Sequence, residues 1–288
     1  MSEESIQITF LIPIATHLHV HPDLENWIRA PALQGHEVIL IIDEVEGVGT
    51  RSSTIELIGR IENSRLPNVL VERTQAGNPG ASRNQGLMAA KGQWVFFWDA
   101  DDVPQLENAI ALVHYANVSG ADIGIGRFSI SGNSGSVVGT SWLDIYKWPG
   151  LWRFTFKSQL IDAVSFEEWG WCEDQKFLVQ ALEVSRSIFR GKDIVYTYTL
   201  NSPGSLTTIR NNWPSLRFFL EFLKRYESQQ RRSLLPILFH LKTVMGLTRY
   251  VSASQTAREL VYLVKVLILN RPNLWPKLVN HAQGGSRL

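Results

Sequence analysis

Short apolar runs alternate with amphipathic segments through the first hundred residues. Four runs rich in β-branched and aromatic residues are typical of buried strands, and they span 6–14, 38–42, 69–72 and 94–98. Helical spacing of apolar residues predicts helices between them at 22–33, 52–61 and 82–90. Buried strands that alternate with helices predict βαβ units. We therefore expect an α/β fold with a doubly wound, mostly parallel sheet flanked by helices.

The pattern loosens after a predicted helix at 105–118. A glycine-rich stretch with short apolar pieces at 120–139 predicts antiparallel strands and loops. Further elements are predicted as helices at 160–163 and 175–184 and a strand at 194–200. From residue 212 onward, long helical segments follow at 213–226, 234–248 and 254–269. We predict an α/β domain at 1–211, with halves 1–104 and 105–211, and an α-helical C-terminal region at 212–288.

Composition narrows the class of protein. The 28 Lys and Arg residues nearly balance 27 Asp and Glu residues, so the basic excess of nucleic-acid-binding proteins is missing. A single cysteine, Cys172, excludes an internal disulfide framework and fits a reducing compartment. The N-terminal segment does not resemble a signal peptide. No window reaches the roughly 18 apolar residues of a membrane span. These features predict a cytoplasmic protein.

The segment FFWDADD at 96–102 is the most informative of the chain. Asp99, Asp101 and Asp102 directly follow a predicted buried strand. Carboxylates this close together repel one another unless a cation lies among them, and hard oxygen ligands suit Mg²⁺ or Mn²⁺. Ligands of open α/β sheets also bind at the carboxyl ends of strands. Alternatively, Asp101 or Asp102 caps a helix that starts at Val103, but that role needs only one carboxylate.

Two further segments contain candidate binding or catalytic residues. In GNPGASRNQG, Gly80 permits close backbone approach, and Arg83 lies in the first turn of a helix, where anions bind. In EEWGWCEDQKF, Glu173 and Asp174 open an amphipathic helix. Both acids would favour the helix dipole. Alternatively, one is a general base whose basicity the apolar neighbours Trp169 and Trp171 raise.

Taken in order, these motifs resemble inverting family 2 glycosyltransferases of the GT-A fold. The resemblance covers about the first 210 residues. It rests on a strand ending in Pro13, Gln34 before EVILIID, the ASRNQG helix start, the DADD segment and the ED pair. The family usually has a second Asp followed by Gly-Ser after the second strand. Here Asp43 is followed by Glu-Val-Glu, which leaves the donor nucleotide open.

The resemblance implies roles for individual residues. Asp43 and the loop from Pro13 to Ala15 would hold the base and ribose of a nucleotide. Arg83 would lie against the same nucleotide. Asp99 and Asp101 match the Asp-x-Asp motif, whose second acid binds the Mn²⁺ or Mg²⁺ that bridges the donor diphosphate. Asp174 matches the catalytic base, and Glu173 lies beside it in the substrate site. Apart from the resemblance, Arg210 in SPGSLTTIR would be placed to reach the diphosphate from a loop, with a solvated side chain as the alternative.

The implied activity is transfer of a sugar from a nucleoside-diphosphate sugar, with UDP-sugar as the expected donor, to an acceptor hydroxyl with inversion. The expected acceptor is a surface polysaccharide or a lipid-linked glycan. The residues also leave two alternative functions open. Val95–Trp98 followed by DADDV also matches haloacid-dehalogenase-like phosphatases, in which Asp99 would be the nucleophile. The other alternative is a binding protein for nucleotide sugars that lacks turnover.

Other features favour structural interpretations. His17, His19 and His21 alternate, which would suit zinc on a strand, but they precede Pro22 and a loop is expected. Arg231 and Arg232 beside an aliphatic helix would suit peripheral contact with an anionic membrane. A packed helical appendage or a homo-oligomer interface is the favoured interpretation of that region.

Overall fold

The computed structural model describes residues 7–131, 136–168 and 173–200, together with positions 254, 257 and 261. Contacts between Cα atoms divide the chain into two units, Met1–Asn212 and Trp213–Leu288. The predicted C-terminal helices belong to the second unit and lie almost wholly outside the described residues. Residues 231 and 232 also belong to this unit and lie outside the described residues. The predicted domain boundaries therefore stay a prediction.

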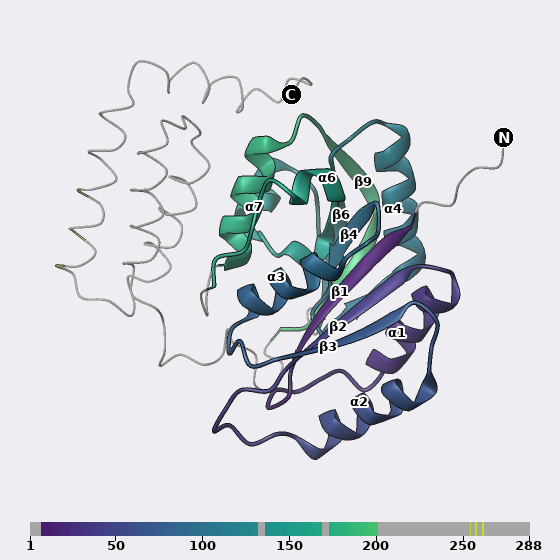
Figure 1. Ribbon diagram of the computed structural model, residues 1–288. Coiled ribbons are helices and arrows are strands. Elements are labelled where there is room, and N and C mark those ends of the chain that lie inside the picture. Colours follow the sequence, from purple (N-terminus) through teal and green to yellow (C-terminus); the bar gives the residue numbers. More distant parts are fainter. Residues whose placement is uncertain are drawn as a thin grey trace. The chain divides into compact units, whose positions relative to one another are not determined.

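The first half of the chain forms a parallel α/β layer (Figure 1). Its strands are β1 (Ile8–Ala15), β2 (Glu37–Asp43), β3 (Val69–Thr74) and β4 (Trp94–Phe97), and its helices are α1 (Leu24–Leu33), α2 (Ser52–Ser64) and α3 (Pro79–Ala89). β1 pairs in parallel with β2 and β4, and β2 pairs in parallel with β3. Every residue of β2 is buried, as expected of a strand covered on both faces. The parallel core was predicted correctly.

The second half extends the same sheet. Its elements are β5 (Val103–Pro104), α4 (Leu106–Val118), β6 (Ile123–Ile130), β7 (Val137–Val138), α5 (Trp142–Lys147), the 3₁₀-helix η1 (Leu151–Arg153), β8 (Phe154–Lys157), α6 (Ser158–Ile161), α7 (Glu173–Val184) and β9 (Ile188–Tyr198). The strand order is β3-β2-β1-β4-β8-β6-β9-β5, with β7 paired to β6. β8 runs antiparallel between β4 and β6 and joins the two halves.

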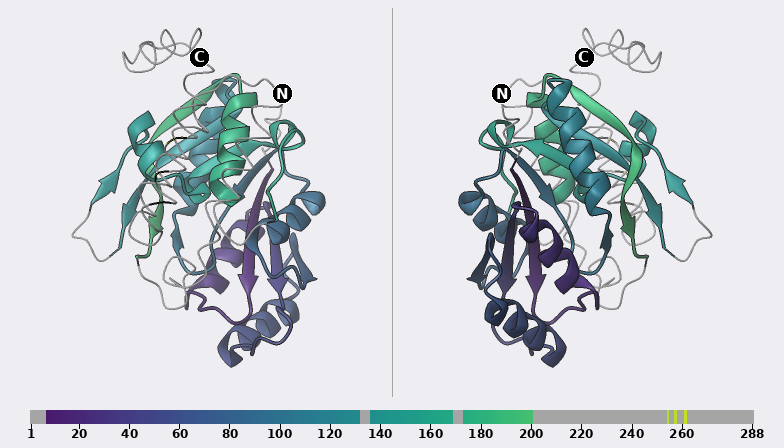
Figure 2. Two further views of the ribbon diagram at one scale, coloured as in Figure 1. Left: turned by 90° about the vertical axis from the view of Figure 1, so that its left-hand side faces the viewer. Right: turned by 90° about the vertical axis from the view of Figure 1, so that its right-hand side faces the viewer.

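Helices cover both faces of this sheet (Figures 1 and 2). α1, α2 and α4 pack on one face, where Phe10, Phe96 and Trp98 belong to the main core. On the other face lie α3, α6 and α7. There Phe97 meets Phe177 edge to face, with ring centroids 5.3 Å apart. No helix in the described ranges is long and apolar enough to cross a membrane.

The structure corrects several details of the prediction. No element was expected at β8, η1 or α5, because runs as short as FTFK do not show a clear period. The helix predicted at 105–118 begins at Leu106, and Val103–Pro104 pairs with β9 as a short strand, so the alternative helix start at Val103 is excluded. Asp102 therefore caps no helix. The loop expected around His17, His19 and His21 is confirmed, because β1 ends at Ala15.

Close packing of α3 on the sheet depends on Gly86. A Cβ atom there would lie 2.5 Å from Leu11 Cδ1 and 3.2 Å from Ile41 Cγ1. We expect Gly86→Ala to lower the free energy of unfolding by about 1–3 kcal/mol, because overpacking forces the helix away from the sheet. The measurement is the urea unfolding midpoint.

The matched control is Gly59→Ala in α2, where a Cβ would meet no atom within 4 Å. This change should raise stability by about 0.4–1 kcal/mol, since alanine loses less backbone entropy on folding. Equal effects of the two substitutions would contradict the packing argument.

Candidate functional site

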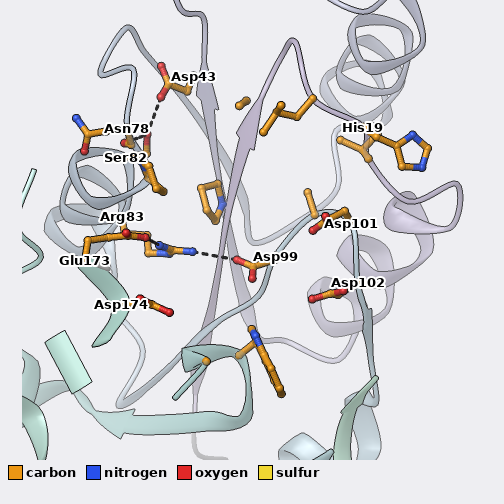
Figure 3. A pocket seen from close by; sticks show the side chains of 18 of the residues that line it. His19, Asp43, Asn78, Ser82, Arg83, Asp99, Asp101, Asp102, Glu173 and Asp174 are labelled. Atoms are coloured by element: carbon orange, nitrogen blue, oxygen red, sulfur yellow. Dashed lines mark hydrogen bonds and ion pairs between the residues drawn. The ribbon is translucent and has the colours of Figure 1, made fainter. Parts of the chain in front are cut away.

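The carboxyl ends of β1, β2 and β4 open onto a cavity of about 520 Å³ (Figure 3). This edge of an α/β sheet is where ligands bind. The residues that line the cavity include eight of the predicted site residues: Pro13, Ala15, Asp43, Arg83, Asp99, Asp101, Glu173 and Asp174. Residues distant in the chain are thus brought together as the sequence predicted. Arg210 lies outside the described residues.

Asp43 organises the edge of the cavity at β2 and the start of α3. Its Oδ1 accepts a hydrogen bond from the Gly77 amide at 3.1 Å, and its Oδ2 accepts one from Ser82 Oγ at 3.1 Å. Asn78 caps α3, because its Oδ1 accepts from the Ala81 amide at 2.8 Å. Both oxygens of the Asp43 carboxylate therefore have protein partners (Figure 3 shows the Ser82 contact).

Arg83 joins two acidic residues that are 74 positions apart in the chain. Its Nη1 donates to Glu173 Oε1 at 2.7 Å and its Nη2 donates to Asp99 Oδ1 at 2.9 Å. The guanidinium also lies 5.5 Å from the ring centroid of Phe166. Burial lowers the pKa of Arg83, but Asp99, Glu173 and Asp174 together raise it by more. Arg83 therefore stays charged and holds the two carboxylates in place.

Burial makes it costly for the acidic residues after β4 to ionise, and Arg83 binds only one of them. Burial raises the pKa of Asp99, and Arg83 only partly offsets this. Burial, followed by the charges of Asp99 and Asp101, raises the pKa of Asp102 to about 8. Asp102 is 1% exposed, and its Oδ1 accepts from the Thr199 amide at 2.7 Å. Asp102 thus ties the acidic segment to the residue that follows β9, and the alternative in which Asp102 caps a helix is not supported.

Asp174 lies in the first turn of α7 and faces the cavity near Asp99 (Figure 3). Burial is the main cause that raises its pKa to about 7, and the neighbouring Glu173 charge adds to it. A carboxyl with this pKa can accept a proton near neutral pH. The predicted apolar neighbours Trp169 and Trp171 lie outside the described residues.

The donor set fits a hard divalent cation that brings its own further ligands. Asp101 lines the cavity, while one Asp99 oxygen is bound by Arg83. Among the described residues no group of three or more metal-ligating side chains is found. Such a site would hold the cation through one or two carboxylates and leave the other positions to phosphate and water, which suits Mg²⁺ and Mn²⁺. The absence of a three-ligand group among the described residues agrees with the interpretation of His17, His19 and His21 as a loop and not as a zinc site.

Sequence reasoning missed several residues of the cavity. Asn78 and Ser82 had a usable signal, because Asn followed by Pro is typical of a helix start. The aromatic residues Trp148, Trp152 and Tyr198 also line the cavity. Their positions carry no motif, so only the fold reveals them.

The curved, largely parallel sheet with acidic residues at its carboxyl edge is a GT-A fold. Staphylococcus aureus TarS, residues 1–349, has the same fold, with 17% identity, a TM-score of 0.61, and coverage of 92% of this chain and 81% of that one. A mannosyltransferase from Pyrobaculum calidifontis matches with 13% identity, a TM-score of 0.53, and coverage of 96% and 84%. These likenesses confirm the predicted fold.

Residues 34–168, somewhat less than half of the chain, match the family model of glycosyl transferase family 2. This segment, which contains β2, α3 and the acidic residues after β4, is a family 2 glycosyltransferase segment. The predicted family is thus confirmed for this part of the chain.

Curated relatives match over about a third of the chain. A poly(ribitol-phosphate) β-N-acetylglucosaminyltransferase of S. aureus is 32% identical over 103 residues, which are 35% of this chain and 30% of the relative. The succinoglycan biosynthesis protein ExoO of Rhizobium meliloti is 24% identical over 92 residues, or 32% and 25%. A poly(ribitol-phosphate) β-glucosyltransferase of Bacillus spizizenii is 26% identical over 95 residues, or 33% and 14%. Each match spans less than a third of the relative.

The bridge made by Arg83 leads to a stability prediction. Arg83→Met keeps most of the side-chain volume but leaves Asp99 and Glu173 without their cation. Breaking a buried ion pair costs about 3–5 kcal/mol, so we expect a loss of that order in urea unfolding at pH 7.5. The two carboxyls would then have raised pKa values in the folded state. Because the folded state then binds more protons, the loss should shrink at pH 5.5.

Arg73→Met is the matched control. Arg73 pairs with Glu44 and Glu62 at the surface, where its side chain is 49% exposed. Removing this exposed pair should change stability by about 1 kcal/mol or less. A loss for Arg83→Met that is equally small, or that does not depend on pH, would show that the buried bridge is not what holds these acids.

Proposed function

We propose that the chain is an inverting glycosyltransferase that moves a sugar from a nucleoside-diphosphate sugar to a hydroxyl of a glycan acceptor in surface polysaccharide synthesis. The observation that carries the proposal is the joint placement of Asp101 and Asp174 in one cavity. A carboxylate for a diphosphate-bound cation and a carboxyl with a pKa of about 7 face the same space. The family 2 match over residues 34–168 supports this reaction class.

The relatives support a nucleotide-sugar donor. TarS has been solved in complex with UDP and with UDP-GlcNAc, and the Pyrobaculum enzyme with GDP-Man and Mn²⁺. We propose a UDP-sugar as donor and Mn²⁺ or Mg²⁺ as the metal. Poly(ribitol-phosphate) and succinoglycan relatives favour a role in surface polysaccharide synthesis.

Asp101 would hold the cation directly, with the free oxygen of Asp99 as a second candidate ligand. When bound, the cation would neutralise charge on the departing diphosphate. Pro13, Ala15 and Asp43 would border the nucleotide, because they lie at the β1–β2 side of the cavity. Arg83 acts indirectly, since its guanidinium is already bound by two carboxylates.

Asp174 would act as the general base. It would take the proton from the acceptor hydroxyl while the hydroxyl oxygen attacks the anomeric carbon opposite the leaving group. The bond to the diphosphate oxygen breaks as the new glycosidic bond forms, which inverts the anomeric configuration. Burial favours this role, because it brings the pKa of Asp174 close to neutral pH.

The phosphatase alternative has less support. Its aspartate motif normally ends the first strand, whereas Asp99 follows the fourth strand, β4, and is bound by Arg83. A binding protein without turnover would not need Asp174 in the cavity with a pKa near 7. The proposed cytoplasmic location, membrane contact and oligomeric state stay predictions.

The base assignment predicts a pH profile. Only deprotonated Asp174 accepts a proton, so kcat should rise about tenfold per pH unit below a pKa of about 7 and level off above it. Asp174→Asn should lower kcat by about 10²–10⁴-fold and remove this limb, while donor binding changes little. The exposed Asp162→Asn is the control. A profile that is flat from pH 5.5 to 8, or wild-type transfer by Asp174→Asn, would refute the assignment.

The metal assignment predicts a linked thermal shift. Adding Mn²⁺ should enlarge the rise in melting temperature that UDP alone produces, because a ligand that binds only the folded state stabilises it. Asp101→Asn should lose the Mn²⁺-dependent part, whereas the exposed Asp23→Asn should retain it. An Mn²⁺-dependent shift that survives in Asp101→Asn would place the metal elsewhere.

A further inference from the structure

One side of the cavity is formed by aromatic residues that belong to no recognised sequence motif. We call it the aromatic wall, and it consists of Trp148, Pro149, Gly150, Trp152 and Tyr198. Trp148 and Tyr198 are half-buried, so their rings retain surface toward solvent. The aromatic content of the chain alone does not distinguish such a wall from ordinary core.

The rings of the wall form one packed unit. Trp152 stacks on Tyr198, with centroids 5.5 Å apart and planes 9° apart, and Trp148 meets Tyr198 at 63° with centroids 6.3 Å apart. Behind the wall, Trp152 also stacks on the buried Tyr196 at 4.8 Å. The Trp152 indole lies against Gly150, where any Cβ would collide with it.

Packing from the core side holds the wall in place. Arg153, the residue after Trp152, is fully buried, with its guanidinium 5.2 Å from the Phe128 ring centroid and 5.5 Å from that of Phe154. Phe128 also meets Trp152 edge to face at 4.5 Å. The wall is therefore a preformed surface, and a ligand does not have to order it.

The wall lies across the acidic residues from the nucleotide edge. In the sheet, β2 with Asp43 is on one side of β4, whereas β8, β6 and β9 are on the other. Trp152 lies in η1, which immediately precedes β8, and Tyr198 ends β9. η1 also packs against α7, which carries Asp174. A ligand on the wall would thus be beside the proposed base, at the end of the cavity away from the nucleotide.

The wall is also uncharged. Among the described residues that line the cavity, Arg83 is the only Lys or Arg, and Asp99 and Glu173 already bind it. A polyol-phosphate chain would need cations for its phosphates. The apolar C–H face of a pyranose ring instead suits an aromatic surface, whose rings bury apolar area while the sugar hydroxyls stay hydrated.

We propose that the aromatic wall is the acceptor subsite and that it binds the pyranose ring of a carbohydrate acceptor, in preference to a polyol-phosphate chain. This inference rests on the proposed glycosyl transfer. The proposed acceptor class differs from the one named for the two poly(ribitol-phosphate) relatives, although the chain shares sequence with them.

The test compares acceptors with the full-length chain, UDP-sugars and Mn²⁺. The probes are gluco-, galacto- and mannopyranosyl oligosaccharides, with oligo(ribitol phosphate) as the rival acceptor. We expect transfer to a pyranosyl acceptor. Trp148→Ala should raise the KM for that acceptor about tenfold while kcat and the donor KM change less than about threefold.

Two further variants separate a binding role from a folding role. Trp148→Phe keeps a ring and should recover most of the acceptor affinity. Trp142→Ala removes a half-buried tryptophan from the other end of α5, outside the cavity, and should leave the acceptor KM unchanged.

The contrary outcomes distinguish a wrong acceptor assignment from a wrong proposed function. Transfer only to oligo(ribitol phosphate), donor hydrolysis without transfer to any pyranosyl probe, or an unchanged acceptor KM in Trp148→Ala would overturn the acceptor assignment and leave the glycosyltransferase intact. Neither hydrolysis nor transfer with any nucleotide sugar would instead count against the proposed function itself.

Discussion

The Arg83 guanidinium is the contact on which the site depends. It comes from α3 and binds Asp99 after β4 and Glu173 on α7, so three elements meet at one buried cation. Without it, buried carboxylates would face one another at the carboxyl edge of the sheet, where desolvation and mutual repulsion both act against folding. The same bridge fixes the position of α7, and therefore the position of the neighbouring Asp174. Stability and the geometry of the proposed chemistry have a common origin here.

The surroundings of each acidic residue determine its role. Asp99 is held by Arg83, Asp102 is buried against the Thr199 amide, and Asp101 keeps its carboxylate toward the cavity. Closely spaced residues of one type thus have separate roles, because each meets a different part of the fold. Asp174 differs again, since burial rather than a paired cation controls its protonation.

Much of this was predictable from local patterns. The strands at β1, β2 and β4 are apolar runs that end at polar residues, and the order of the motifs indicated the family before any contact was known. The second half was harder, because β8 has four residues and β5 has two. Such segments do not show a period, and they become strands only because neighbouring strands offer hydrogen-bond partners. For the same reason, the sequence alone did not exclude the alternative in which Asp102 caps a helix.

Local sequence patterns set which residue types were available and where the strands end, and therefore that carboxylates gather at the carboxyl edge of a parallel sheet. The pairing of these carboxylates and the surfaces around them depend on the packing of the layers. Arg83 meets Glu173, and Trp152 meets Tyr198, through contacts between residues far apart in the chain. Contacts of this kind depend on how layers pack against each other, and local periodicity carries no information about that packing. The aromatic wall is therefore a property of the fold, although each of its rings is visible in the sequence.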